Sequence, residues 1–464
     1  MEKNILSKST YIKGNQCLKY LFLYKKFPKL RDNIPQERMA KFKRGTDVGV
    51  YAQQIFPGGI DCSPKSPSQY QKMIEFTAAQ IETGTNVLYE ALFQFNKTLV
   101  IIDILVKDEL GKYHAYEVKS SLKLSETYYE DASLQYFVIK NSLPDLESIS
   151  LIYLNQDYVL EDTIEIAELF KIENITNSAK DRWNAIENKI NAQLLALENE
   201  EIPNLSIGQH CFLPYDCEFI GYCWQNIKSP NYFDVPILTF DEKENLFKTK
   251  SFDLQSFREV FSQNPIALRQ AQSLFYNRPT LQKDYSTEYP VFIKFLFMKP
   301  AIPLFRKSKP YQSRMYGFSA LKNENGKNTE ITELSENQDE LISKLKNWIS
   351  KNERLICYES NTEFLREHFS DYLIFNLLED LKNGDYYHPA IKSDVDFASV
   401  FQAFTGSKIW FAKINNEQYA AILYEEYLIN DKSQNQFVEN LNNIRIYVKN
   451  FVLGLQKLHY KLNE

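Results

Sequence analysis

The chain has 464 residues, of which 44% are hydrophobic and 25% are charged, and its formal net charge is −6. This composition is typical of a soluble globular protein of two to three domains, and its mild acidity counts against a nonspecific DNA-coating protein. No apolar run reaches the roughly 18 residues of a membrane-spanning helix, and the first ten residues lack the apolar core of a signal peptide. We therefore expect a cytoplasmic protein with no membrane partner.

The first half of the chain is predicted to mix helices with strands. Apolar residues at helical spacing indicate helices, whereas runs rich in β-branched residues between polar turns indicate strands. The polar segment Lys107–Lys112, which contains Gly111, predicts a hairpin turn. In chain order we expect a helix from about 16 to 24, helices at 38–56 and 67–84, strands at 87–95, 98–106 and 113–120, a helix at 128–140, a strand at 148–154 and a helix at 177–200.

Asp103 lies in the middle of the apolar strand 98–106. A lone carboxylate there is costly to bury unless a positive or protic group meets it. Because strand side chains alternate between faces, Glu117 and Lys119 share a face, and the hairpin places Asp103 beside them. Two carboxylates and an ammonium on one face suit a hard divalent cation. Such a cation lowers the pKa of its bound water and offsets the charge of a phosphodiester.

Asp103 and Glu117-Val118-Lys119 together resemble the D…ExK motif of the PD-(D/E)xK nuclease superfamily. The resemblance implies that Asp103, Glu117 and the carbonyl of Val118 bind one or two Mg²⁺ or Mn²⁺ ions. Lys119 would position the attacking water or stabilise the charge that develops on the phosphate.

Two further residues strengthen this resemblance. Glu90 lies in the preceding strand, where relatives often carry an additional acid that completes the metal shell. Gln135 lies on the following helix, where the RecB-like branch carries a characteristic Gln that orients the site or contacts the nucleic-acid strand. That branch usually has a Tyr four residues later, where this chain has Ile139.

Three of the six cysteines fall in one short window, Cys211-x5-Cys217-x5-Cys223, and Cys17 lies far upstream. In a reducing compartment cysteines are free thiols or ligands rather than disulfides. Four thiolates can hold a [4Fe-4S] cluster or a structural zinc ion. Both alternatives remain open from the spacing alone.

This order of cysteines resembles the iron–sulfur branch that includes the CRISPR-adaptation nucleases and nuclease subunits of bacterial recombination complexes. There the cluster fastens the N-terminal helix to the C-terminal end of the nuclease domain. The resemblance implies Cys17 as the first ligand and Cys211, Cys217 and Cys223 as the other three. The CRISPR-adaptation enzymes also use a His near residues 45–59, which this chain lacks.

The last third of the chain resembles the ribonuclease-H-like DEDD exonuclease domain that follows the iron–sulfur nuclease in a related bacterial family. The first strand of that domain carries an Asp-x-Glu pair that binds two metals. Here Lys294 and Leu296 occupy those positions, while Glu363 and Asp380 stand at later-motif positions. Without the first pair a two-metal mechanism cannot be assembled. The implied domain keeps the fold, is catalytically inactive, and serves to hold nucleic acid or dock a partner.

The predicted fold class is α/β, with two domains that each resemble a nuclease fold. Residues 1–228 are expected to form a restriction-endonuclease-like mixed sheet flanked by helices, with the iron–sulfur group as a staple. Residues 229–285 are expected to form a helical connector, and residues 286–464 the ribonuclease-H-like domain.

The predicted function is that of a metal-dependent DNA nuclease, exonucleolytic on single strands or duplex ends as the resemblance implies. DNA repair, recombination and antiphage defence all use such enzymes, and other nuclease, helicase or defence-complex subunits are the expected partners. The alternative is a degenerate nucleic-acid-binding or scaffolding subunit, because the second domain has lost its leading acids. An ordinary ion pair on a solvated hairpin would explain the motif alone, but not its combination with Gln135 and the cysteines.

Overall fold

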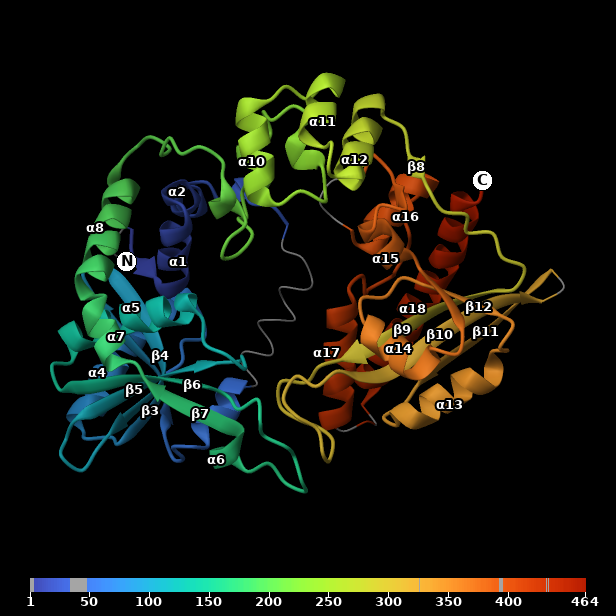
Figure 1. The fold of residues 1–464 in the computed structure, drawn as a ribbon. Helices are drawn as coiled ribbons and strands as arrows, with labels where there is room; N and C mark the ends of the chain where they lie inside the picture. Colours follow the sequence, from blue (N-terminus) through green and yellow to red (C-terminus); the bar gives the residue numbers. More distant parts are fainter. Residues whose placement is uncertain (1–3, 34–47, 325, 392–394, 431, 433) are drawn as a thin grey trace. The chain divides into compact units, whose positions relative to one another are not determined.

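The computed structural model describes residues 4–33, 48–324, 326–391, 395–430, 432 and 434–464 (Figure 1). The chain divides into two compact units. The first contains Met1–Asn226 and Pro300–Gln312, and the second contains Ile227–Lys299 and Ser313–Glu464. Each unit is built on its own mixed sheet, so the molecule is a mixed α/β protein.

The sheet of the first unit has seven strands in the order β2-β3-β4-β5-β6-β7, with β1 paired in parallel with β4. Strands β3 to β5 form an antiparallel meander, whereas β5 and β6 are parallel and joined through α5. Strands β3 to β6 and α5 begin and end within two residues of the predicted ones, whereas β1, β2 and β7 were not predicted. Their bounds are β1 (Leu6–Ser7), β2 (Ile60–Asp61), β3 (Val87–Phe95), β4 (Thr98–Lys107), β5 (Tyr113–Lys119), α5 (Glu126–Ser142), β6 (Leu146–Leu154) and β7 (Phe170–Asn174).

The N-terminal helix begins earlier than we predicted. Instead of one helix from about residue 16, two helices meet at Cys17: α1 (Lys8–Gln16) and α2 (Leu18–Lys26). Ser7 and Thr10 form a capping box that starts α1, because a side-chain oxygen at the N-cap satisfies a free backbone N–H of the first turn. Gly14 and Asn15, which precede the predicted helix, lie inside α1.

The other helices of the first unit follow the sequence pattern with small differences. Residues 48–53 are helical, and the earlier part of the predicted helix 38–56 lies largely outside the described residues. The predicted helix 177–200 is divided into two. The remaining bounds are η1 (Pro28–Leu30), η2 (Pro67–Gln69), α4 (Tyr70–Glu82), α6 (Ile166–Leu169), α7 (Thr176–Asp181), α8 (Trp183–Glu198), η3 (Gln209–Cys211) and α9 (Ile220–Cys223).

Both faces of this sheet are covered. Helices α1, α5 and α8 lie together on one side of it (Figure 1), where Leu105 and Ala115 join one buried apolar cluster. The opposite face carries Ile104 and Tyr116 in a second cluster, which also includes residues of the segment 300–312. This segment is the part of the predicted second domain that packs instead in the first unit.

The second unit contains a five-stranded sheet in the order β11-β10-β9-β12-β13. Strands β9, β12 and β13 are parallel, and β10 and β11 are antiparallel to their neighbours. Helices α13 and α14 supply apolar residues to one face of this sheet. Helix α17 packs against β9, and α18 packs against β9, β10 and β11. The bounds are β9 (Pro290–Met298), β10 (Arg314–Glu324), β11 (Lys327–Leu334), α13 (Gln338–Trp348), β12 (Arg354–Cys357), α14 (Thr362–Phe369), β13 (Leu373–Asn376), α15 (Leu377–Lys382), α16 (Phe397–Thr405), α17 (Glu417–Ile429) and α18 (Asn435–Leu462).

Residues 229–285, expected as a separate connector, belong to the second unit. Strand β8 (Thr280–Leu281) pairs with β14 (Tyr386–Tyr387), and Arg269 donates a hydrogen bond to the carbonyl of Gly384 at 3.4 Å. This strand pair and this hydrogen bond join residues 229–285 to the later part of the second unit. Its helical elements are η4 (Tyr232–Asp234), α10 (Phe240–Thr249), α11 (Leu254–Val260) and α12 (Pro265–Tyr276). Among the described residues, no helix combines the length and apolarity that a bilayer crossing requires.

Candidate functional site

Strands β4 and β5 separate where the acidic motif lies. Their backbone pairing ends at Ile104 and Tyr116, and continuing this register would place Asp103 opposite Glu117. Beyond that point the N–H of Val118 donates a hydrogen bond to Oδ2 of Asp103 at 2.5 Å. The Asp103 carboxylate therefore replaces a backbone partner of β5 and lies against the ExK segment, as predicted from the alternation of side chains.

Glu90 joins this group through an irregularity in the sheet. The pairing of β3 with β4 passes from Tyr89 to Ala91 and omits Glu90, and it omits Asp103 on the other strand. Glu90 has a φ of 53°, in the left-handed region that non-glycine residues seldom occupy. Burial and the nearby Glu117 carboxylate raise the pKa of Glu90 to about 7. The predicted extra acid thus lies within electrostatic reach of the motif.

Two lysines converge on Glu117. The ammonium groups of Lys119 and Lys8 each donate a hydrogen bond to Oε1 of Glu117 at 2.7 Å. Lys119 also pairs with Asp131 on α5, and Lys8 lies 3.7 Å from the same carboxylate. Glu117 and Asp131 are both nearly inaccessible to solvent. Neither Lys8 nor Asp131 belongs to the predicted motif.

This arrangement sets the protonation of the site. Burial opposes ionisation of Glu117, but Lys119 and Lys8 outweigh it and hold its pKa well below the usual range. Burial and the charge of Glu117 raise the pKa of Asp103 well above its usual value. Four carboxyl groups and two ammonium groups thus gather here. With every carboxyl group ionised the set would carry a net charge of −2, which a bound divalent cation would neutralise. The carboxyl groups are those of Glu90, Asp103, Glu117 and Asp131.

Several buried polar atoms at the site have no hydrogen-bond partner among the described residues. They are Oε2 of Glu117, Oδ1 of Asp131 and both amide atoms of Gln135. Gln135 lies on α5 four residues after Asp131, so the two side chains share a helix face. A buried polar atom without a partner costs about 1–3 kcal/mol, and a bound ion, water or substrate is a usual reason for one. This donor set fits a metal ion.

The acids nevertheless do not form a closed ligand cage. Within the described residues, no three or more His, Cys, Asp or Glu side chains are grouped so that they could hold one metal ion. The physical reason at the acidic motif is that Lys8 and Lys119 already contact the Glu117 and Asp131 carboxylates. The predicted metal ligands therefore lie near one another, but their side chains do not surround one common metal position.

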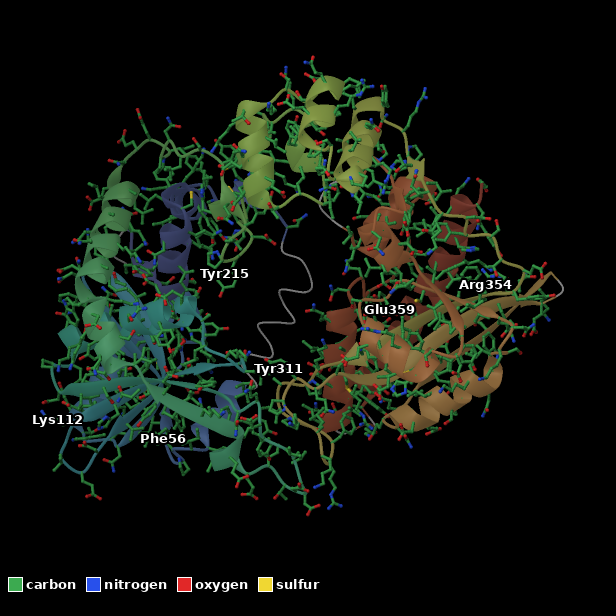
Figure 2. The ribbon with its side chains drawn as sticks, viewed as in Figure 1. Phe56, Lys112, Tyr215, Tyr311, Arg354 and Glu359 are labelled. Carbon is green, nitrogen blue, oxygen red and sulfur yellow. The ribbon has the colours of Figure 1, made fainter. Side chains whose placement is uncertain are left out.

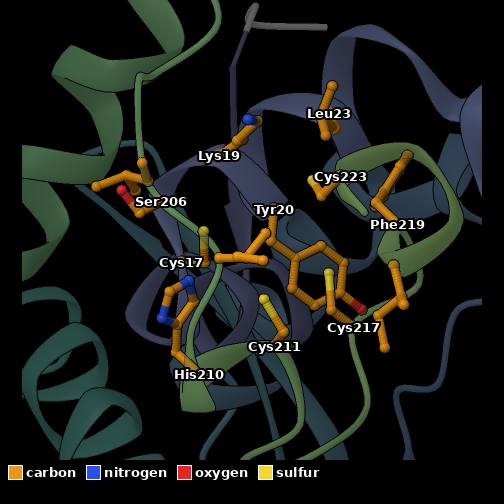
Figure 3. A pocket seen from close by; sticks show the side chains of 13 residues that line it. Cys17, Lys19, Tyr20, Leu23, Ser206, His210, Cys211, Cys217, Phe219 and Cys223 are labelled. Atoms are coloured by element: carbon orange, nitrogen blue, oxygen red, sulfur yellow. The ribbon is translucent and has the colours of Figure 1, made fainter. Parts of the chain in front are cut away.

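The four predicted cluster cysteines line a single pocket (Figure 3). Cys17 is the residue between α1 and α2, whereas Cys211, Cys217 and Cys223 follow one another through η3 and α9. An apolar group around Tyr20 and Phe219 packs beside them.

The pocket disfavours free thiolates. Burial raises the pKa of the Cys17 and Cys223 thiols and raises that of Cys217 to about 12, and the neighbouring cysteines add to each shift. Four soft sulfur donors in a pocket that disfavours bare thiolates fit a positively charged group, which would deprotonate them on binding. His210 lines the same pocket without having been predicted as a ligand.

In the second unit, Lys294 lies on β9, at the position where the resemblance led us to expect an acid. Its ammonium is 3% exposed and pairs with Glu359 at 3.0 Å and with Glu417 at 2.7 Å. The Glu359 carboxylate, labelled in Figure 2, also accepts the N–H of Phe295 at 3.0 Å. Leu296 is fully buried among apolar residues. The carboxylates here are thus engaged by a lysine.

The two later-motif acids of the second unit lie in different environments. Glu363 is exposed on the first turn of α14. Asp380 is buried and pairs with Lys283 at 2.7 Å.

Comparison with protein-family models finds no match, and comparison with curated proteins finds none either. The geometry of the acidic motif and of the cysteine pocket is therefore the basis for assigning a function to this protein.

Proposed function

We propose that the first unit is a metal-dependent nuclease that hydrolyses phosphodiester bonds in DNA. The observation that carries the proposal is the meeting of Asp103, Glu117 and Lys119 where β4 and β5 separate, with a buried unpaired oxygen of Glu117 beside them. The order of the antiparallel meander, α5 and the parallel β6 supports a restriction-endonuclease-like fold for this unit.

In this mechanism Asp103, Glu117 and the carbonyl of Val118 hold one or two Mg²⁺ or Mn²⁺ ions, and Glu90 completes the shell. A bound ion would lower the pKa of a coordinated water and offset charge on the phosphate. Lys119, which pairs with two carboxylates, would turn its ammonium toward the attacking water or the charged phosphate oxygen. Gln135 supplies a buried amide that can donate to and accept from the bound strand.

We propose that Cys17, Cys211, Cys217 and Cys223 hold a [4Fe-4S] cluster that stabilises the nuclease unit. The support is that the four cysteines line one pocket, because four thiolates are the usual ligand set of such a cluster. Zinc remains the alternative ligand of the site. The strand order of the second unit supports a ribonuclease-H-like domain, and the engaged acids around Lys294 support its being inactive.

The competing function is a degenerate nucleic-acid-binding or scaffolding subunit of a larger nuclease or defence complex. The observation that favours it is that two lysines already pair with Glu117 and Asp131, and that the acids among the described residues do not form a closed cage. Repair, recombination and defence all remain settings in which either function would act.

The decisive experiment uses the full chain, purified without oxygen, on labelled single-stranded and duplex DNA with Mg²⁺ or Mn²⁺. Asp103→Ala and Lys119→Ala are expected to lower cleavage about 100-fold or more. Asp108→Ala and Lys112→Ala, in the exposed turn between the same strands, serve as matched controls and should cleave normally. Equal cleavage by all four variants would remove the nuclease assignment, and binding without cleavage by the unmodified chain would favour the scaffold.

The cluster is tested on the same preparation. Iron content and absorption near about 400 nm should be present and should fall in Cys217→Ser. Cys62→Ala, outside the pocket, should keep both. A colourless protein with one zinc per chain would assign the pocket to zinc.

A further inference from the structure

We propose that Lys8 is a positioning residue of the nuclease site, which fixes the Glu117 carboxylate so that its free oxygen faces the metal. The inference rests on the proposed function and names a residue outside the D…ExK motif. Lys8 lies 109 residues before Glu117 in the sequence, and its ammonium donates to Oε1 of Glu117 at 2.7 Å.

The backbone around Lys8 is fixed on both sides. The preceding residues Leu6 and Ser7 form β1, which pairs in parallel with Thr98 and Leu99 at the start of β4. Lys8 itself is the first residue of α1, whose first turn is closed by the Ser7 capping box. A side chain that starts from so constrained a backbone reaches the site from a set direction.

Lys8 determines which oxygen of Glu117 is free. Both Lys8 and Lys119 donate to Oε1, whereas Oε2 is buried and has no partner among the described residues. A carboxylate held twice by one oxygen presents the other to a cation. With Lys119 alone, one ammonium could be shared by both oxygens, and Oε2 would be taken from the metal.

Lys8 also leaves Lys119 available for the reaction. Lys119 pairs with both Glu117 and Asp131, and in the proposed mechanism it must also serve the water or the phosphate. A second ammonium on Glu117 keeps this carboxylate oriented when Lys119 turns toward substrate. Partners of this kind, one step removed from the metal, commonly change metal affinity 10–100-fold when they are lost.

The test compares Lys8→Met and Lys8→Arg in the full chain with Lys26→Met, an exposed lysine of α2. Mn²⁺ binding is measured by calorimetry without DNA, and cleavage is measured against Mn²⁺ concentration. We expect Lys8→Met to weaken Mn²⁺ binding about 10–100-fold while cleavage at saturating Mn²⁺ falls less. Lys8→Arg should restore most of the affinity, and Lys26→Met should behave as the unmodified chain.

The outcomes separate this proposal from the proposed function. Unchanged or tighter Mn²⁺ binding by Lys8→Met, in a chain that cleaves DNA with Mn²⁺, overturns the role of Lys8 alone. Loss of affinity that Lys8→Arg does not restore, with altered hydrogen exchange across α1, indicates a structural ion pair and also overturns it. An unmodified chain that neither binds Mn²⁺ nor cleaves DNA overturns both proposals.

Discussion

The side-chain amide of Gln135 is a costly group to place inside the first unit. It is fully buried, and neither its nitrogen nor its oxygen has a partner among the described residues. Such a group lowers the stability of the fold, and groups of this kind are retained mainly where function requires them.

We predict that Gln135→Leu leaves the stability of α5 unchanged or raises it by about 1 kcal/mol, because it removes unpaired polar atoms. The same change should lower DNA cleavage at least tenfold. The matched variant is Gln193→Leu, because the buried Gln193 amide donates to the carbonyl of Tyr11 and to Asn15. Gln193→Leu should destabilise the unit by about 1–3 kcal/mol. Hydrogen exchange and a cleavage assay measure both effects; a large loss of stability in Gln135→Leu would contradict the argument.

The stability of the second unit is expected to depend on pH because of Glu359. Burial and Glu417 raise its pKa to about 7, against the opposing effect of Lys294. The folded state therefore binds this proton more tightly than the unfolded state, so the stabilising contribution is complete below about pH 4.5 and is lost as pH rises through about 7.

We predict that the free energy of unfolding falls more steeply between pH 4.5 and 7 in the unmodified chain than in Glu359→Gln. Denaturation by urea at several pH values measures the difference. Glu363→Gln, at an exposed acid of the following helix, should keep the pH dependence of the unmodified chain. Parallel profiles for Glu359→Gln and the unmodified chain would show that Glu359 does not titrate in this window.

At the residue level, the sequence predicted the residues of the acidic site that lie on one pair of strands. It did not predict the site residues that come from distant elements. Asp103, Glu117 and Lys119 were found because side chains of strands alternate with a period of two. Lys8 and Asp131 come from α1 and α5, and no spacing rule connects a lysine near the N-terminus with a glutamate 109 residues later. A residue at positive φ, such as Glu90, is also invisible to a periodic pattern.

Among the elements, α1 connects the two candidate sites of the first unit. Its first residue is Lys8 at the carboxylates, and the residue after its end is Cys17 at the cysteine pocket. The helix packs closely on α8: a Cβ on Gly14 would lie 2.3 Å from the side chain of Gln193. The absence of a side chain at residue 14 therefore leaves room for the Gln193 side chain between the two helices.

We predict that Gly14→Ala destabilises the packing of α1 by about 1–3 kcal/mol and lowers both the iron content and the Mn²⁺ affinity. Hydrogen exchange of α1 and metal analysis measure these effects. Gly49→Ala is the control, because nothing lies within 4 Å of a Cβ there and the residue is also helical. It should change stability by less than about 1 kcal/mol; equal behaviour of both variants would contradict the close packing of α1.

The existence and type of most elements in the first unit were predictable, but the start of α1 was not. Long periodic runs defined β3 to β6 and α5, because burial on one or both faces imposes their pattern. Gly14 and Asn15 hid α1, since both residues commonly mark the end of a helix rather than its interior.

At the scale of the whole molecule, the placement of the segment 300–312 was not predicted from the order of the sequence. It follows β9, which belongs to the second unit, but packs in the first unit, where Ile302 joins the apolar cluster on the sheet. Backbone hydrogen bonds join it there: Leu160 donates to the carbonyl of Ser308 at 3.0 Å, and Lys307 donates to that of Leu160 at 2.6 Å. The Tyr311 hydroxyl, labelled in Figure 2, donates to the carbonyl of Ser120 at 2.6 Å, one residue after Lys119.

We predict that Ile302→Ala destabilises the first unit by about 2 kcal/mol or more, because it leaves a cavity in this cluster. Hydrogen exchange at Leu160 should rise, although the substituted residue lies far from it in sequence. Arg306→Ala, on the exposed side of the same segment, should stay within about 0.5 kcal/mol of the unmodified chain. Faster exchange confined to the second unit would contradict this packing.

The route of the segment 300–312 has a consequence for how the protein is made. During synthesis on the ribosome, the apolar cluster around Ile104 and Tyr116 lacks its last members until residue 312 has emerged, long after the last strand of its own sheet. The nascent chain must therefore carry an unfinished first half through the translation of most of the next hundred residues, and this interval is when a chaperone would be needed most.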